Sequence, residues 1–600
     1  MTKKIHFKAS ARHARRRVCA LLALLWVGLS VWAVPAQHIR RQVRLADGST
    51  AVATLYGNSH LHWLLTERGQ VLVPTADGGS YEPSAQTHAD MVAQMGRAGE
   101  EHARRSPRRI GSQATAPLPA TGNPKVPVVL VNFADTHFTV GSTDEEVRQY
   151  YELYCNGTRN GQRYNGHGSW GAIRDYFIDQ SDSLFQPEFV IIGPVQLDYG
   201  YAHYGKNNAS GQDSNYNLFR THAVQKAVSQ FDIDWLAQFD NRGKNQVDMV
   251  FFIFAGMGEA NGGDANTIWP KETGSSATIG GIRFATNACC NELRATAMDD
   301  DGNVTETAAD GIGIMCHELS HALGLPDFYD TQGQGFGMDV WSVMDYGEYC
   351  ANGYCPVGYT AYERDFMGWR PLQTLTEKGS YVLKPVGADG IGYKVVNPQN
   401  PNEYYVLENR QRAGWDRALA SYGRGLMVTH VDYQTSAWNN NTVNTNSNHQ
   451  RMTIIAANDR YVGSSASRDM NEWRITWAGN LYPYEQLDSL TDLSNPAAKV
   501  WTSNGLMGQP IYEITQADDE GCIRFSFLEK IMTGITALPA QAGSQPGTTF
   551  GSSPAQPTDT EPAYDLSGRR INAARHYKGL VIRNGKLVRE RKSEKVKSEK

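Results

Sequence analysis

The stretch CHELSHALGLPD, residues 316–327, decides how this chain is interpreted. It has the spacing H-E-x-x-H-x-x-G-x-x-D. On a helix, His317 and His321 lie four residues apart and share one face, with about 5–6 Å between their Cβ atoms. Two neutral imidazoles placed in this way can hold one Zn²⁺. The pattern therefore predicts a short helix that binds a metal.

The other fixed residues of the pattern have roles in the same site. Glu318 is next to a ligand in sequence but is rotated around the helix, so we expect it to reach a water that the metal polarises. Gly324 can adopt the positive φ that ends a helix and reverses the chain. Asp327 can then return as a third ligand and leave a fourth position open. The sequence predicts a catalytic zinc site with His317, His321 and Asp327 as ligands and Glu318 as general base.

A second motif, WSVMDYG at residues 341–347, follows the predicted zinc helix. An S-x-M-x-Y segment at this place resembles the Met-turn of metzincin peptidases. Met344 would form an apolar floor below the metal and not a ligand. Tyr346 is a candidate catalytic residue, as a donor to a tetrahedral oxyanion or as a switching metal contact, with simple packing as the alternative.

Several longer stretches resemble the immune inhibitor A-like family of secreted metallopeptidases. They are HELSHALGLPDFYD, the upstream FFIFAGMGEANGGDANTIW, and the downstream YYVLENRQRAGWD and GLMVTHVDYQTSAWNNNTVN. The likeness extends from about Gly122 to about Glu529. Metzincins usually end the zinc motif with His, whereas this chain has Asp327. The resemblance implies a secreted zinc endopeptidase that acts on proteins or peptides, with an α/β (α+β) metzincin-like catalytic domain.

Two other interpretations stay open. A gluzincin-like site would take its third ligand from a downstream glutamate, such as Glu348 or Glu363. Outside the enzyme class, the chain would be a surface adhesin with a vestigial protease domain. The intact residues at all four catalytic positions argue against the adhesin.

The composition and the first residues indicate an exported globular protein. A length of 600 residues suggests several domains, and the net charge of −5 gives no reason to expect nucleic acid as a partner. Residues 1–33 match a cleaved signal peptide, with a basic start, the apolar run Val18–Trp32 and a small-x-small site at Ala33. The apolar run of about 15 residues is short for a membrane span. We expect a secreted or cell-surface protein with no membrane span in the mature chain; nothing in the sequence indicates an oligomeric state.

Residues 34–121 are predicted to be a prosegment with a linker, or else a small accessory domain. Short strand-like runs are followed by the basic stretch Arg104–Arg109, which offers an exposed site for cleavage after Arg. No cysteine lies between Cys19 and Cys155, so a group that blocks the zinc must be a carboxylate, an imidazole or backbone. The candidate side chains are those of Asp47, His60, His62 and Asp77.

The rest of the chain divides by pattern. Residues 122–372 alternate strands with helices and are expected to form the catalytic domain. Residues 373–530 carry short alternating apolar runs that predict a β-sandwich domain. Residues 531–562 are rich in Gly, Pro, Ser, Thr and Gln and predict a linker. Residues 563–600 weakly resemble small C-terminal modules that serve secretion or surface attachment.

Calcium and a disulfide are the remaining chemical questions. The loop Asp240–Asp248 lies where the resembled family often has an acidic loop reminiscent of calcium sites, but Arg242 and Lys244 stand within it. A hard cation needs several oxygen ligands of net negative charge, so we predict a turn here, and calcium stays possible elsewhere. Cys350 and Cys355 flank a Gly-rich loop and are the best candidates for a disulfide, with two reduced core thiols as the alternative.

An Asn-rich stretch in the predicted sandwich has two interpretations. The side chains of Asp432, Asn439–Asn441 and Asn444 would be able to line a binding site. Asn-rich turns are, however, more often structural.

Overall fold

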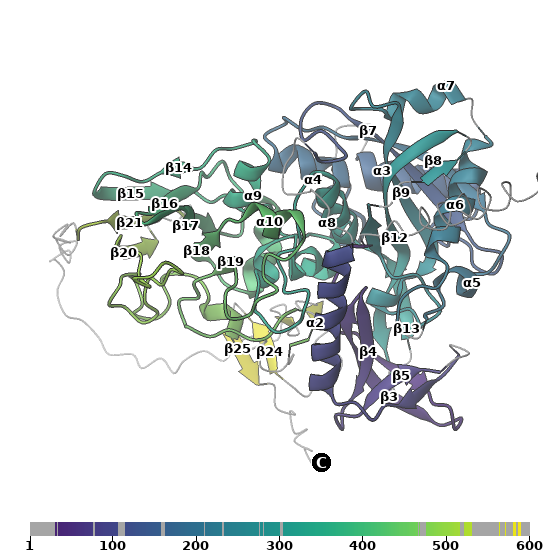
Figure 1. The fold of residues 1–600 in the computed structure, drawn as a ribbon, viewed down its shortest axis with the longest axis horizontal. Coiled ribbons are helices and arrows are strands. Elements are labelled where there is room, and N and C mark those ends of the chain that lie inside the picture. Colours follow the sequence, from purple (N-terminus) through teal and green to yellow (C-terminus); the bar gives the residue numbers. More distant parts are fainter. Residues whose placement is uncertain are drawn as a thin grey trace, which may run out of the picture.

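The computed structural model describes residues 31–32, 34–75, 79–105, 115–157, 163–208, 211–230, 233–274, 277–279, 281–299, 304–465, 467–468, 476–516, 521–530, 563–564, 570–571, 580–583 and 586–589. Most of the predicted signal peptide, the predicted linker 531–562 and Asp77 lie outside these residues. Three regions are seen in Figure 1: an N-terminal region (residues 34–105), a central region (115–372) and a C-terminal region (373–530). None of the described helices is long and apolar enough to span a bilayer.

The central region is built on a mixed β-sheet. Its middle is parallel, because β12, β9, β7 and β8 are neighbours in that order and run in the same direction. The apolar β9 is buried along most of its length, as expected for a parallel strand covered on both faces. These strands are β7 (Lys125–Asn132), β8 (Glu188–Gln196), β9 (Gln246–Met257) and β12 (Ile282–Met298).

Antiparallel strands extend this sheet beyond β12. β10 (Lys271–Thr273) pairs with β12, and β1 (Val31–Trp32) pairs with β10. β11 (Ala277–Ile279) and β13 (Val304–Ala309) also pair with β12. Two residues inside the predicted signal peptide are therefore paired with a strand of the central sheet.

Short helices surround the sheet, and α8 (Gly313–Ala322) carries the HExxH motif. Every residue of α8 is buried, which fits its apolar sequence. The helix ends where expected, and Gly324 has a φ of 110°. The other α-helices are α3 (Asp144–Asn156), α4 (Ile173–Gln180), α5 (Tyr201–Gly205), α6 (Tyr216–Val228), α7 (Ile233–Leu236) and α9 (Ala361–Phe366). The 3₁₀ segments are η1 (Gly166–Gly168), η2 (Ala237–Phe239), η3 (Glu259–Asn261), η4 (Asp339–Trp341) and η5 (Tyr346–Gly353).

The N-terminal region is an antiparallel meander covered by a long helix (Figure 1). Met91 and Met95 of the helix α2 pack with Trp63 and Val71 of the sheet in a small core. The elements are β2 (Arg40–Arg44), β3 (Thr50–Asn58), β4 (Leu61–Thr66), β5 (Val71–Pro74), β6 (Tyr81–Pro83) and α2 (His88–Arg105).

The C-terminal region consists of two sheets that share one hydrophobic core, the arrangement of a β-sandwich. One sheet has the order β14-β16-β17-β18-β19, and the other β15-β21-β20. The strands are β14 (Gln373–Thr374), β15 (Gly379–Leu383), β16 (Tyr393–Asn397), β17 (Asn400–Arg410), β18 (Gly425–Asp432), β19 (Met452–Ile454), β20 (Ile511–Gln516) and β21 (Ile523–Phe527). Between them lie η6 (Gly414–Ser421), α10 (Thr435–Asn439) and η7 (Trp477–Gly479). Four short strands follow: β22 (Ala563–Tyr564), β23 (Arg570–Ile571), β24 (Leu580–Arg583) and β25 (Lys586–Arg589).

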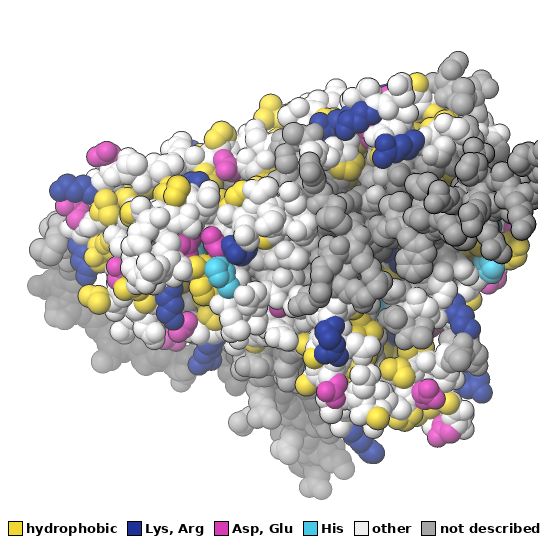
Figure 2. Space-filling model, viewed as in Figure 1, with side chains coloured by type: hydrophobic (Ala, Val, Ile, Leu, Met, Phe, Trp, Pro, Cys, Tyr) yellow, Lys and Arg dark blue, Asp and Glu magenta, His cyan; other side chains and the backbone are white. Residues whose placement is uncertain are grey.

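The three regions meet around α8. The largest hydrophobic core joins Leu319 of α8 and Met344 to Leu64 of the N-terminal region and Trp438 of the C-terminal region. On the face drawn in Figure 2, basic and acidic side chains are interspersed over the described surface without a continuous area of one sign. That distribution fits the modest net charge of −5.

The described cysteines are all buried, and none of them forms a disulfide. Cys350 and Cys355 are therefore the two reduced core thiols of the alternative interpretation, and burial raises the pKa of both.

In the loop Asp240–Asp248, both carboxylate oxygens of Asp240 accept backbone N–H groups, from Lys244 at 2.7 Å and Asn245 at 2.8 Å. These acceptors are used to fix a turn.

Candidate metal centre

His317, His321 and Asp327 converge on one buried point. Nε2 of His317 and Nε2 of His321 lie 3.1 Å apart. Oδ1 of Asp327 lies 3.2 Å from the first nitrogen and 3.3 Å from the second. Among the residues that the structure describes, this is the one group of three or more His, Cys, Asp or Glu side chains placed closely enough to hold a metal ion.

The backbone orients both imidazole rings. Nδ1 of His317 donates to the carbonyl of Val343 at 2.8 Å, and Nδ1 of His321 donates to the carbonyl of Leu325 at 2.8 Å. A carbonyl can only accept, so each Nδ1 carries the proton and each Nε2 offers a lone pair. Burial lowers the pKa of His317 and favours this neutral form.

Asp327 presents one free oxygen to the two imidazoles. Its Oδ2 accepts a hydrogen bond from Nδ2 of Asn441 at 2.6 Å, whereas Oδ1 is buried without a hydrogen-bond partner. Burial alone would raise the pKa of Asp327, but His321 and His317 outweigh it and lower that pKa. Bonds of about 2.0–2.1 Å to one tetrahedral ion place the ligand atoms about 3.3 Å apart, which agrees with the separations of these three atoms. The donor set of two nitrogens and one unpartnered carboxylate oxygen fits Zn²⁺.

Glu318 is a buried carboxylate without a hydrogen-bond partner on either oxygen. Burial, followed by the nearby charges of Asp327 and Glu272, raises its pKa well above the usual range. A buried carboxylate with two unpartnered oxygens is costly and calls for a functional explanation. Glu318 lies on α8, which packs against β12 and β10 of the sheet.

The segment after α8 folds back beneath the centre. The N–H of Phe328 donates to the carbonyl of Met344 at 2.8 Å, and Met344 is fully buried. The N–H of Met344 in turn donates to Oγ of Ser342 at 3.0 Å. Val343 and Met344 thus support His317 and the chain that carries Asp327.

Comparison with known proteins agrees with this geometry. Residues 119–370 match the family model described as immune inhibitor A peptidase M6, catalytic domain. Residues 119–370 are therefore similar to the catalytic domain of that peptidase family. The chain is 25% identical over 279 residues to Immune inhibitor A of Bacillus thuringiensis subsp. alesti, covering 40% of this chain and 39% of that protein. It is 24% identical over 276 residues to the pre-pro-metalloprotease PrtV of Vibrio cholerae serotype O1 (strain M66-2), covering 40% and 29%. The chain therefore matches less than half the length of either relative.

The alternative glutamate ligands lie elsewhere in the peptidase segment. Oε2 of Glu348 is 3.8 Å from Nδ1 of His317, the ring nitrogen that bonds Val343 and not the one that faces His321. Glu363 accepts the N–H of Thr360 at 2.6 Å and so helps to cap α9. Neither carboxylate joins the three converging side chains.

Tyr346 contacts the N-terminal region. Its hydroxyl donates to the carbonyl of Gln37 at 3.1 Å, and the guanidinium carbon of Arg468 lies 4.6 Å from its ring centroid. Tyr349 donates to the carbonyl of Pro35 at 2.8 Å in the same way. The backbone of residues 35–37 thus contacts two tyrosines that follow Met344 in the sequence.

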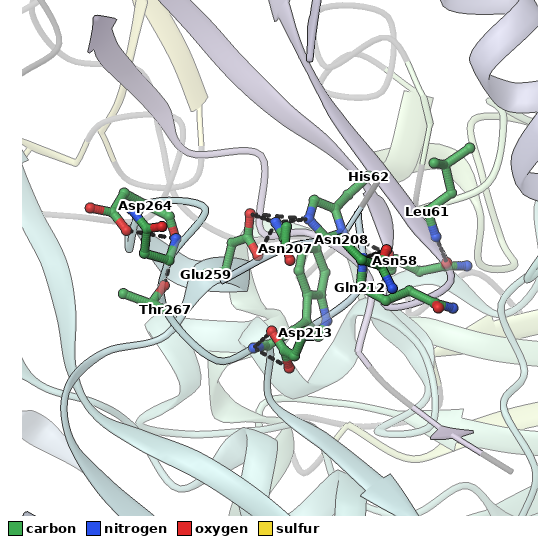
Figure 3. A network of polar contacts seen from close by, with 12 residues as sticks. Asn58, Leu61, His62, Asn207, Asn208, Gln212, Asp213, Glu259, Asp264 and Thr267 are labelled. Carbon is green, nitrogen blue, oxygen red and sulfur yellow. Dashed lines mark hydrogen bonds and ion pairs between the residues drawn. The ribbon is translucent and has the colours of Figure 1, made fainter. Parts of the chain in front are cut away.

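Two of the four candidate blocking side chains, His62 and Asp47, have other partners in the structure. Nε2 of His62 lies 3.0 Å from Oε1 of Glu259 (Figure 3). The His62 ring also stacks on Trp269 with 4.4 Å between ring centroids. Asn207 donates to both oxygens of Glu259 at 3.0 Å. Asp47 is exposed and bonds Ser49. His62, one of the four unranked candidates, thus contacts Glu259 and Asn207 of the central region and is not one of the three converging side chains.

Sequence reasoning missed several of these contacts. The sequence indicates Asn441 only as part of an Asn-rich turn. Nothing in the neighbouring residues predicts that Asp327 is its partner. Oγ of Ser465 donates to Asp345 at 2.7 Å, and Arg468 pairs with Asp339 at 2.5 Å. No local pattern indicated that a loop of the C-terminal region reaches the segment around Met344.

Proposed function

We propose that the chain is a secreted zinc endopeptidase that hydrolyses peptide bonds in proteins. His317, His321 and Asp327 would hold the metal, and Glu318 would act as general base. The proposal rests on one observation: Nε2 of His317, Nε2 of His321 and the unpartnered Oδ1 of Asp327 converge in a buried position. The similarity of residues 119–370 to the catalytic domain of the peptidase family supports it.

The protein's part in the reaction is the handling of one proton. When bound, Zn²⁺ would supply Lewis acidity that polarises the scissile carbonyl and acidifies a water. Glu318 accepts a proton from the attacking water, and the same proton is delivered to the amine nitrogen as the C–N bond breaks. Its burial, which raises its pKa, makes Glu318 a stronger base than an exposed carboxylate.

We further propose that the fold of the peptidase segment is metzincin-like, with Met344 as the apolar floor. The buried Met344 and the bond from Phe328 to its carbonyl support this assignment. Tyr346 is a candidate oxyanion donor whose hydroxyl is bonded to Gln37 in this structure. That role would require the N-terminal region to move away.

The N-terminal region is proposed to be a latency segment. The hydroxyls of Tyr349 and Tyr346 donate hydrogen bonds to the carbonyls of Pro35 and Gln37. The backbone of the N-terminal region would therefore cover this part of the site. Export through the predicted signal peptide fits a protease kept silent until release.

Hydrolysis of casein by the purified protein tests the proposal. Activity should be lost on treatment with a chelator and restored by Zn²⁺. Hydrolysis that continues at full rate in chelator would refute it, and a protein that binds a surface ligand but never cleaves casein after activation would favour the adhesin.

A further inference from the structure

The turn after α10 brings one side chain of the C-terminal region to the metal centre. Asn441 accepts the backbone N–H of Asp327 at its Oδ1, at 2.7 Å, and donates from Nδ2 to Asp327 Oδ2, at 2.6 Å. The two bonds run in opposite directions between the same two residues. A primary amide is suited to this, because it has a donor and an acceptor side by side.

The backbone places that amide. Asn441 has a φ of 55°, in the left-handed region that Asn tolerates better than most residues. Trp438, fully buried just before it, anchors the end of α10 in the largest core. The turn is therefore fixed by packing, not by Asp327 alone.

Asn444 holds the neighbouring residue of the zinc segment. Its Nδ2 donates to the carbonyls of Phe328 at 2.7 Å and Met452 at 2.6 Å. Its Oδ1 accepts the N–H groups of Arg451 at 2.9 Å and Met452 at 3.0 Å. Asn444 is 1% exposed and ties Phe328 to β19. Asn441 and Asn444 thus form hydrogen bonds to Asp327 and Phe328, two consecutive residues after α8.

The hydrogen bond from Asn441 restricts the rotation of the Asp327 carboxylate. Asp327 follows a turn at Gly324 and is joined to α8 only by that short reversal. With Oδ2 bonded to Asn441, the unpartnered Oδ1 faces Nε2 of His317 and of His321. Without the amide, either oxygen would be free to turn toward the imidazoles or away from them.

We propose that Asn441 is a positioning residue of the metal centre, through which the C-terminal region sets the orientation of Asp327. This inference rests on the proposed function, in which Asp327 is a zinc ligand. Hydrogen-bond partners of metal ligands contribute about 10–100-fold to metal affinity, because they fix ligand orientation.

The test is the zinc affinity of the full-length chain carrying Asn441→Gly, measured by competition with a chromophoric chelator. Glycine keeps the left-handed backbone without strain and removes only the amide. The zinc Kd should rise by about 10–100-fold. The visible spectrum of the Co²⁺-loaded variant should also change, which a purely structural role of Asn441 would not cause. Asn446→Gly is the matched control, since Asn446 is exposed in the same loop and bonds Asn448.

Wild-type zinc affinity and an unchanged Co²⁺ spectrum in Asn441→Gly would overturn the inference. The thermal midpoint of the metal-free protein reports whether the variant folds. If it does not fold, Asn441→Asp takes its place, because Asp has nearly the same size, loses the N–H donor and sets a second carboxylate oxygen against Asp327 Oδ2. Because the added charge also acts on zinc affinity, wild-type affinity together with an unchanged Co²⁺ spectrum in that variant would equally overturn the inference. If His321→Ala also binds zinc normally, the ligand set of the proposed function is wrong instead.

Discussion

The N-terminal and C-terminal regions both reach the centre of the peptidase segment, but they do so with different groups. The N-terminal region offers main-chain carbonyls of Pro35 and Gln37 to two tyrosine hydroxyls. The C-terminal region offers the side-chain amide of Asn441 to Asp327. A contact made by backbone to residues beside the site can be withdrawn without dismantling it. If Asp327 is a metal ligand, as proposed, the contact that orients it has to remain.

The polar side-chain contacts of the two regions also differ. The N-terminal region contributes His62, which pairs with the buried Glu259 beside Asn207. The C-terminal region pairs Arg468 with Asp339 and bonds Ser465 to Asp345, on either side of Met344 in the sequence. Under the proposed function, the first region would act as a removable cover and the second as a permanent support.

The largest expected change in activity comes from a substitution in the candidate metal centre. The effects expected from the N-terminal and C-terminal regions are compared with it. Glu318→Ala removes the proposed base but no ligand, so the protein should keep its zinc and lose at least about 10³-fold in peptidase activity. Casein hydrolysis and metal analysis of the same sample measure this. Normal turnover would remove Glu318 from the mechanism, and loss of zinc would point to a structural role.

Removal of the N-terminal region should have the next largest effect, in the direction of gain. Protein starting near Gly122 should be at least about tenfold more active than protein that retains residues 34–121, a difference of about 1.4 kcal/mol in the barrier. An arginine-specific protease should produce the same gain by cutting within Arg104–Arg109. Equal activity of the two forms would identify the N-terminal region as a folding aid or accessory domain.

A smaller gain is expected from loosening the cover in the full-length chain. His62→Ala leaves Glu259 bonded to Asn207 but removes a buried partner, at a cost of about 1–3 kcal/mol to the contact. The variant should be activated several-fold faster by the arginine-specific protease than the parent chain. Asp47→Ala, on the exposed part of the same region, is the control. Unchanged activation of His62→Ala would show that the pair does not hold the cover in place.

The convergence of the three candidate ligands was predictable because its information is local. His317 and His321 share a helix face by spacing alone, and the reversal at Gly324 returns Asp327 within a few residues. Alternation of strands and helices likewise indicated the mixed sheet of the central region. In each case, the residues that interact are close in sequence.

The partners of the centre were not predictable, because they are distant in sequence. Asn441 is 114 residues from Asp327, and Gln37 is 309 residues from Tyr346. The sequence indicated that His62 was a possible ligand type but not which acidic group it would meet. That choice depends on how the N-terminal sheet docks against Trp269 and Glu259 of η3, for which no local pattern exists.

The bound zinc of three single variants tests the account most directly. We predict about one zinc per chain in the parent, in Glu348→Ala and in Glu363→Ala, and loss of zinc in Asp327→Ala. Metal analysis of purified, dialysed protein makes the measurement. Full zinc in Asp327→Ala together with loss in Glu348→Ala or Glu363→Ala would contradict the account and establish a gluzincin-like ligand set.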